Sequence, residues 1–286
     1  MCNPSCALWY VASQAPSFGD FIRNLKVTKG ITKLHMVIYE DGYKVGNVIR
    51  PDHGRGLDAL YYTFLEMPDW MMSSCIGWFS LAYIPERKLK TISKSWPLQL
   101  AVEAIYGDPG QPNLADVGVF LLCTDGTNEH FQIEDTIFLL SDEVALVGQL
   151  NLKGCQGKKP CVKCRNVMAR TTVEALRADP YLFHFSTAVP ENFDLNTDAQ
   201  VYEQADILQN LVGQIAPQNF KKIEIAFGMR YEAAAVMFVP RVRRHIRPAT
   251  GTIYDWMHSI VASGSLSHYE LNGYVLRCAN KYSYKT

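Results

Sequence analysis

The sequence predicts a mixed α/β protein. Apolar runs of strand length recur in its first half, and segments with apolar residues at helical spacing lie between and after them. The composition is that of a folded chain, because 48% of the 286 residues are hydrophobic, 12% are aromatic and 20% are charged. These values exclude a disordered chain, a collagen-like repeat and a coiled coil. A chain of this length buries about 75% of its unfolded surface, in one large domain or two modest ones.

Three strands and two helices are expected in the first third of the chain. The first strand becomes wholly apolar before it stops at Glu40-Asp41-Gly42, and Pro68-Asp69 separates the second strand from the third. Apolar residues at helical spacing precede the first strand and follow the third. The expected helices are residues 17–26 and Trp96 to Tyr106, and the expected strands are Thr32 to Tyr39, Tyr61 to Met67 and Gly77 to Ile84.

A hairpin and another helix are expected next. Asp125-Gly126 is a strong turn signal, and it lies between the apolar runs Val117 to Thr124 and Phe131 to Leu140. The second run ends at Ser141-Asp142. Apolar residues at helical spacing over 144–150 then predict a helix directly after that acid.

The chain changes character after residue 150. Residues 151–170 contain six Lys or Arg and no acid, with glycines and a proline around three cysteines, which indicates a loop or a small subdomain. A helix is expected over 198–213, behind the start signal Thr197-Asp198. Its apolar stripe, which would pack on a core, consists of Val201, Ala205, Leu208, Leu211 and Val212. No internal repeat occurs, which excludes a solenoid.

Charge and cysteine content limit the partners and the compartment. The 28 basic and 28 acidic residues cancel, so a nucleic-acid surface would be a local patch. The uncharged stretch Trp70 to Pro85 is about 16 residues, shorter than a membrane span, so no transmembrane helix is expected. The eight cysteines are unevenly spaced, which favours an intracellular reducing compartment. The first residues carry no positive charge and predict buried polypeptide, or the cut edge of something longer, instead of a signal peptide.

Two acids, Asp41 and Asp142, each stand where an apolar strand run ends. Side chains at such positions reach an edge of the sheet, and paired carboxylates there can hold Mg²⁺, which prefers hard oxygen ligands and keeps substrate phosphate in its shell. The alternative is that both acids form turns, as acids at strand ends often do.

The pair Cys161 and Cys164 forms a CxxC knuckle inside GCQGKKPCVKC. Thiolates at this spacing can bind one Zn²⁺, with further ligands from Cys155 or from a distant side chain such as His258. Two alternatives stay open, namely loop cysteines without a metal and a redox-active pair.

Basic residues gather in two segments that could contact nucleic-acid phosphates, because Arg donates to phosphate in a bidentate manner. A solvated basic helix face is the alternative. The candidate DNA-binding residues are Lys158, Lys159, Lys163 and Arg165 in the first segment and Arg241, Arg243, Arg244 and Arg247 in the second. Further along, Asp255 and His258 are three residues apart and would share one face of a helix.

The order of these features resembles the cut-and-paste DNA transposases of the D-D-E class, in particular CACTA-type elements and related transposon-derived proteins. YEDGYKVGNVIRP, with Asp41, looks like the family's first-acid segment. SDEVALVGQLNLKGCQGKKPCVKCRNV, with Asp142, looks like the second-acid segment running into a cysteine knuckle. YDWMHSIVASG, with Asp255 and His258, matches the signature that follows, and the resemblance covers roughly residues 32–275.

This resemblance implies a ribonuclease H-like core, a mixed sheet flanked by helices with the first acid on its first strand and the second acid after its fourth. It also implies a cysteine-bearing loop subdomain and a helical insertion. The implied divisions are an N-terminal remnant, the first part of the core, a basic cysteine knuckle and an insertion region with the DxxH signature, at residues 1–31, 32–152, 153–170 and 171–286.

The resemblance further implies strand cleavage and transfer at transposon ends. Asp41 and Asp142 would hold two Mg²⁺ or Mn²⁺ ions for in-line displacement at phosphorus. Cys161 and Cys164 would be structural, and DNA, a homo-oligomer and a nuclear location are expected. The family's third acid, a Glu, comes well after the signature, whereas Glu270 lies only twelve residues after His258.

The position of Glu270 leaves two expectations for this chain. It is either a fragment that lacks its final core helix and its DNA-binding domain, or a decayed copy without catalysis. A domesticated or decayed derivative that binds DNA or protein through the knuckle is the first alternative function. An unrelated metal-dependent hydrolase is the second, because a pair of acids fits many folds.

Overall fold

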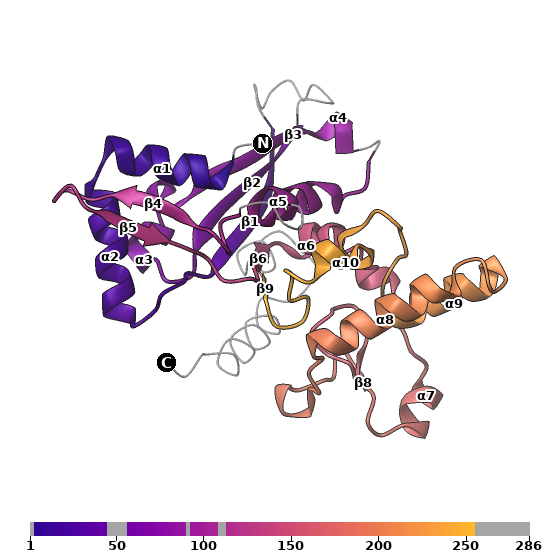
Figure 1. The fold of residues 1–286 in the computed structure, drawn as a ribbon. Coiled ribbons are helices and arrows are strands. Elements are labelled where there is room, and N and C mark those ends of the chain that lie inside the picture. The colour runs from indigo at the N-terminus through magenta and orange to yellow at the C-terminus, as the bar shows by residue number, and fades with distance from the viewer. Residues whose placement is uncertain (1–2, 45–55, 90–91, 108–112, 255–286) are drawn as a thin grey trace. The chain divides into compact units, whose positions relative to one another are not determined.

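The structure is a computed structural model that describes residues 3–44, 56–89, 92–107 and 113–254 (Figure 1). Contacts divide the chain into two compact units, and each is described by itself. The first comprises Met1–Leu140 and Val239–Arg247, and the second Ser141–Phe238 and Pro248–Thr286. The predicted α/β class is confirmed as a mixture of helices with a mixed parallel and antiparallel sheet.

A sheet forms the centre of the first unit, with four of its strands in the order β3-β2-β1-β6. β1 pairs antiparallel with β2, β2 pairs antiparallel with β3, and β6 pairs in parallel with β1. Since parallel neighbours need a crossover connection, the chain between β1 and β6 can hold other elements. The bounds are Met36–Lys44 for β1, Gly56–Phe64 for β2, Phe79–Pro85 for β3 and Phe138–Ser141 for β6.

The first strand does not end at Glu40-Asp41-Gly42, so this expected boundary is wrong. β1 continues to Lys44 because β2 pairs along its whole length, up to the pair Lys44 and Gly56. The backbone hydrogen bonds of a hairpin do not require apolar side chains, which is why a charged, glycine-containing segment extends the strand.

The expected hairpin around Asp125-Gly126 is confirmed, but its second strand is shorter than expected. β4 (Val119–Leu122) pairs with β5 (Asn128–Phe131), and β6 begins separately at Phe138. The helices α1 (Pro4–Gln14) and α2 (Ser17–Lys29) pack against this hairpin (Figure 1).

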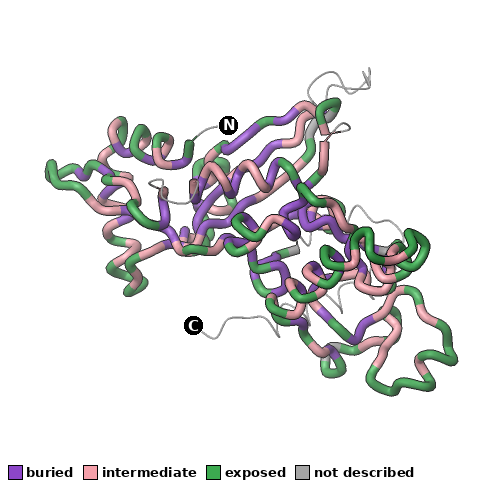
Figure 2. The backbone as a smooth tube through the Cα atoms, turned by 45° about the vertical axis from the view of Figure 1, so that its right-hand side comes forward, coloured by how far each residue is buried: buried purple, intermediate pink, exposed green. Residues whose placement is uncertain are grey.

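A cluster of aromatic side chains lies in the core of the first unit. Phe64 on β2 and Phe131 on β5 are fully buried, with ring centroids 5.0 Å apart in an edge-to-face arrangement. Tyr62 and Phe79 stack at 5.1 Å beside them. Figure 2 shows how buried positions follow the strands. The expected helix α5 (Trp96–Tyr106) is confirmed with the expected bounds, and its apolar face is buried.

The second unit is mainly helical. α6 (Glu143–Gln149) follows Asp142 as expected, and α8 (Asp198–Leu211) confirms the expected helix over 198–213. A capping box between Thr197 and Gln200 begins α8. α9 (Pro217–Phe227) was not expected from the sequence.

Short elements complete the described chain. In the first unit they are α3 (Asp69–Met72), α4 (Glu86–Leu89) and α10 (Pro240–Arg243), and in the second α7 (Val173–Ala178), β7 (Val167–Met168), β8 (Phe183–His184) and β9 (Thr252–Tyr254). Among the described residues, no helix has the length and apolar character needed to cross a membrane.

Candidate functional site

The acids Asp41 and Asp142 are each two residues beyond a pair of residues that joins β1 to β6. The described pairs between β1 and β6 run from Val37 with Phe138 to Tyr39 with Leu140. Asp41 and Asp142 each follow the last of these pairs by two residues. Asp41 lies within β1 and is half-buried, whereas Asp142 is the first residue after β6.

Asp142 has a local structural role as the N-cap of α6. Its backbone is extended, and its Oδ1 accepts a hydrogen bond from the backbone N–H of Ala145 at 2.6 Å. Loss of hydration and the neighbouring Asp142 charge raise the pKa of Glu143. The structure thus supports the turn-forming interpretation of Asp142, and a carboxylate that caps with one oxygen keeps a second oxygen for a ligand.

Contacts within the second unit engage several predicted DNA-binding side chains. The Lys163 amine donates to the backbone oxygen of Thr252, and Arg165 pairs with Asp194. Lys158 is exposed, whereas Lys159 is half-buried. Some of the basic side chains of residues 151–170 are therefore engaged in contacts within this unit.

The second basic segment is engaged in a similar way within the first unit. Arg241 pairs with Glu103 at 2.7 Å, and the Arg244 Nε–H donates to His245 Nε2 at 2.9 Å. Arg243 is half-buried and Arg247 is exposed. DNA binding by either segment stays a prediction.

The two knuckle cysteines differ in their surroundings. Cys161 is half-buried, and its Sγ accepts the backbone N–H of Lys163 at 3.2 Å. Cys164 is 5% exposed and packs with Val167 and Phe193. The described His, Cys, Asp and Glu side chains add no third ligand to this pair. Zinc binding stays a prediction, since His258, like Asp255, lies outside the described residues.

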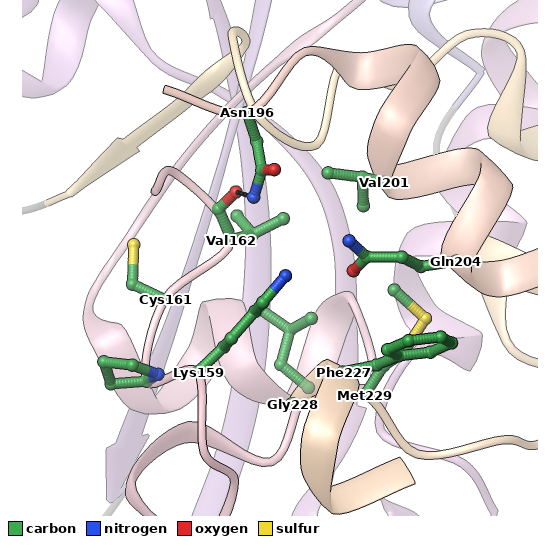
Figure 3. A pocket seen from close by; sticks show the side chains of 11 residues that line it. Lys159, Cys161, Val162, Asn196, Val201, Gln204, Phe227, Gly228 and Met229 are labelled. Carbon is green, nitrogen blue, oxygen red and sulfur yellow. Dashed lines mark hydrogen bonds between the residues drawn. The ribbon is translucent and has the colours of Figure 1, made fainter. Parts of the chain in front are cut away.

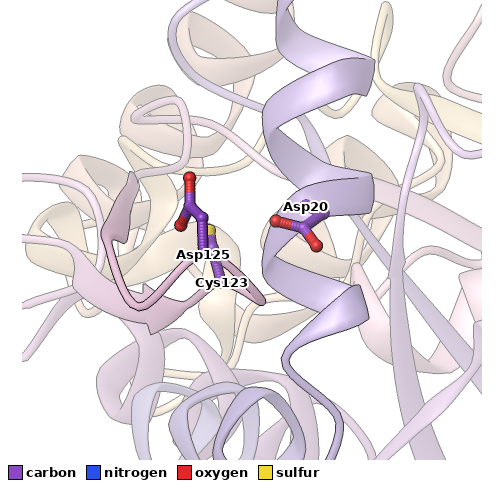
Figure 4. A group of neighbouring side chains, drawn as sticks. All are labelled: Asp20, Cys123 and Asp125. Atoms are coloured by element: carbon purple, nitrogen blue, oxygen red, sulfur yellow. The ribbon is translucent and has the colours of Figure 1, made fainter.

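A different group of possible metal ligands lies in the first unit. Ligand atoms of Asp20, Cys123 and Asp125 are all within 4.8 Å of one another (Figure 4). Asp20 accepts from the Thr124 hydroxyl at 2.5 Å, and hydrogen bonds from Thr127 and Arg23 hold the pKa of Asp125 well below its usual range.

Burial raises the pKa of the Cys123 thiol, so this sulfur is protonated at neutral pH. Asp20 belongs to α2, and Cys123 and Asp125 belong to the hairpin. The observed hydrogen bonds therefore explain the group as a link between α2 and the hairpin.

A buried histidine in the first unit is held by ring stacking and by hydrogen bonds to both ring nitrogens. His245 is 7% exposed and stacks on Tyr106, with ring centroids 3.8 Å apart. Its Nδ1 donates to the Asp135 carbonyl at 2.7 Å, and its Nε2 accepts from Arg244, which defines a neutral tautomer. Burial, and then the Arg244 charge, lower the pKa of His245, although the Asp135 carbonyl opposes this.

Acidification from about pH 7 to about pH 5 is expected to destabilise the chain through His245. Since the pKa of His245 is lower in the folded than in the unfolded chain, the unfolded chain takes up the proton first. The stabilisation is complete above the unfolded pKa of about 6.5 and is lost progressively as the pH falls from that value through the lower folded pKa. Urea unfolding at several pH values should show a smaller loss in His245→Gln; an equal loss in that variant contradicts the assignment.

One pocket in the second unit is formed by residues that no sequence motif indicates. Lys159 from the basic loop, Asn196 from the segment before α8 and Gln204 from α8 line it (Figure 3). Asn196 and Gln204 belong to no recognisable motif, and Lys159 stood out only as one of several basic residues.

Comparison with known proteins identifies no family. No protein-family model matches this sequence, and no curated protein matches it.

Proposed function

We propose that this chain carries two acids of a ribonuclease H-like core that transfers phosphodiester bonds on DNA, in the manner of D-D-E transposases. The observation that carries the proposal is the placement of Asp41 and Asp142 relative to the paired strands β1 and β6. The strand order β3-β2-β1-β6, antiparallel except for the parallel pair of β1 and β6, supports it.

The alternation of side chains supports one face for both acids. Residues two apart on a strand point to the same face, and paired residues on parallel strands do so too. Asp41 follows Tyr39 by two residues and Asp142 follows Leu140 by two. Tyr39 pairs with Leu140, and this register supports the proposal that the two carboxylates share one face of the sheet. The extended backbone of Asp142 is consistent with this continuation.

Oxygen ligands at this position suit Mg²⁺ or Mn²⁺. Asp41 and Asp142 would hold the metal, which when bound would activate a hydroxyl nucleophile and stabilise the leaving oxygen of an in-line displacement. The N-cap bond from Ala145 holds the Asp142 side chain in one orientation, so α6 also positions the second acid.

Metal binding and DNA cleavage test this proposal in three variants. Asp41→Asn and Asp142→Asn each remove one charge, and asparagine at 142 retains an N-cap side chain. Each is expected to weaken Mn²⁺ binding, followed by the electron paramagnetic resonance of free Mn²⁺, by at least about tenfold, and to abolish Mn²⁺-dependent nicking of supercoiled DNA. Glu40→Gln is the matched control, because Glu40 alternates to the other face of β1.

The double variant shows whether the two acids share one ion. If they do, Asp41→Asn combined with Asp142→Asn loses less affinity than the sum of the two single losses predicts. Additive losses contradict a shared ion. If Asp142→Asn leaves Mn²⁺ binding unchanged, Asp142 acts only as a helix cap.

A second candidate is a binding module built on a zinc knuckle. The N–H of Lys163 that points at Cys161 Sγ favours this candidate, because a donated hydrogen bond stabilises a thiolate. Bound zinc that is lost in Cys161→Ser, in a chain without Mn²⁺-dependent nicking, would favour the module over the enzyme.

A further inference from the structure

The second unit contains a pocket that the proposed chemistry does not use. Its walls are the basic loop at 159–162, Asn196, one face of α8 and the residues that end α9. The space between these walls is about 290 Å³, including the part open to solvent. Figure 3 shows polar groups of three side chains around this space, with apolar Val162 and Val201 beside them.

Asn196 presents a buried acceptor to this pocket. The side chain is 7% exposed, and its Nδ2 donates to the Val162 carbonyl at 2.7 Å, which fixes the amide orientation. Its Oδ1 is buried and has no hydrogen-bond partner within the described part of the chain. Figure 3 shows this oxygen on the side of Val201, away from Val162. A buried carbonyl in this state is stabilised by a donor from a bound molecule, an ordered water included.

Lys159 presents a charge that no described carboxylate balances. Its half-buried amine points into the pocket, and the Gln204 amide faces it from α8 (Figure 3). No described acid forms an ion pair with Lys159. Burial lowers the pKa of Lys159, and the positive charge of Arg165 lowers it further. A half-buried cation with another cation as its charged neighbour would be stabilised by a bound anion.

We propose that this pocket binds inorganic hydrogen phosphate through Lys159, Asn196 and Gln204. The ion supplies both an acceptor and a donor to the pocket. Its charged oxygens accept from Lys159, and its remaining P–OH donates to Asn196 Oδ1. The Gln204 amide can donate to a further oxygen. A fully deprotonated anion satisfies only the lysine and leaves the asparagine oxygen unpaired.

Calorimetric titration of the whole chain with sodium phosphate at neutral pH tests this site, with sodium sulfate as the comparison ion. Phosphate should bind saturably, and sulfate, which carries no proton at this pH, should bind at least about tenfold more weakly. Equal binding of the two ions would show that the Asn196 oxygen plays no part and would overturn the assignment. Absence of phosphate binding would overturn it as well.

Two variants and one control locate the site. Lys159→Met removes the charge, and Gln204→Glu places a carboxylate opposite Lys159 without changing side-chain size; each should lower phosphate affinity at least about tenfold. Lys221→Met makes the same charge change as Lys159→Met on an exposed position of α9, and should change affinity less than about twofold. Circular dichroism of each variant separates lost binding from lost folding. Equal losses in Lys159→Met and Lys221→Met would mean that phosphate binds through general charge only.

A third ligand distinguishes free phosphate from the phosphate group of a nucleotide. A nucleotide monophosphate is mostly the doubly charged form at neutral pH and lacks the donating proton. It should therefore bind more weakly than inorganic phosphate and improve when the pH is lowered to about 6. Tighter binding of the monophosphate at neutral pH would overturn the choice of the free ion. The acids Asp41 and Asp142 do not enter this test, so its failure leaves the proposed function untouched.

Discussion

Phe64→Ala is expected to lower the free energy of unfolding by about 3–5 kcal/mol. The Phe64 ring is fully buried on β2. It contacts the hairpin residue Phe131 in an edge-to-face arrangement, and its ring centroid is 6.5 Å from that of Phe79. Its removal loses the transfer free energy of the ring and leaves a cavity between strands that pack from distant parts of the sequence. Urea unfolding followed by tryptophan fluorescence measures the loss.

Phe120→Ala is the matched control for this substitution. Phe120 is on β4 of the same hairpin but is 60% exposed, and it stacks on His130 with centroids 4.8 Å apart. Removal of this ring should cost less than about 1 kcal/mol, the size of a cross-strand pair. Equal costs for the two substitutions would mean that Phe64 is not in the centre of the core.

Local signals account for the elements that the sequence predicted well. The α5 pattern ends at Gly107, which has a positive φ of 69°, and begins with Pro97 in the first turn, so both ends carry their own signal. The hairpin turn at Asp125-Gly126 is equally local, since Gly126 has a φ of 79°. The cap of α8 follows from the spacing of Thr197 and Gln200.

The strand boundaries that the sequence misplaced depend on partners far away in the chain. Phe131 to Leu140 looked like one strand, yet Ile133 forms a single bridge to Leu34 and Ile137 forms one to Ile246. An apolar pattern reports burial but not the identity of the partner strand, so it could not show that the run divides into β5 and β6.

Residues of the candidate sites could likewise be predicted where local sequence determines their surroundings, and not where contacts with distant residues do. Asp142 could be predicted at a strand end because α6 and its cap are local. The ion pairs of Arg165 with Asp194 and of Arg241 with Glu103 join distant positions in the chain. Because the sequence does not reveal such pairs, it predicted that both arginines were available to contact DNA. The Asn196 acceptor is defined only by the absence of a partner within the described fold, a property that no motif encodes.

Gly228→Ala is expected to destabilise the chain by about 2–5 kcal/mol. Gly228 ends α9 with a φ of 70°, where a side chain costs about 1–2 kcal/mol. A Cβ there would also come within 3.0 Å of the backbone oxygen of Lys159, closer than real Cβ atoms approach a neighbour. This oxygen belongs to backbone, which cannot rotate away, so overpacking adds about 1–3 kcal/mol.

Gly213→Ala separates these two contributions, because Gly213 has a φ of 73° and nothing within 4 Å of its hypothetical Cβ. Only the backbone cost of about 1–2 kcal/mol should appear there. The difference between the two variants in urea unfolding then measures how tightly α9 meets the Lys159 loop. Equal losses of stability in the two variants would show that this loop shifts easily to accommodate the added Cβ. A larger cost for Gly228→Ala implies that the loop holding Lys159 is fixed by close packing, and therefore that the pocket is formed before any ion enters it.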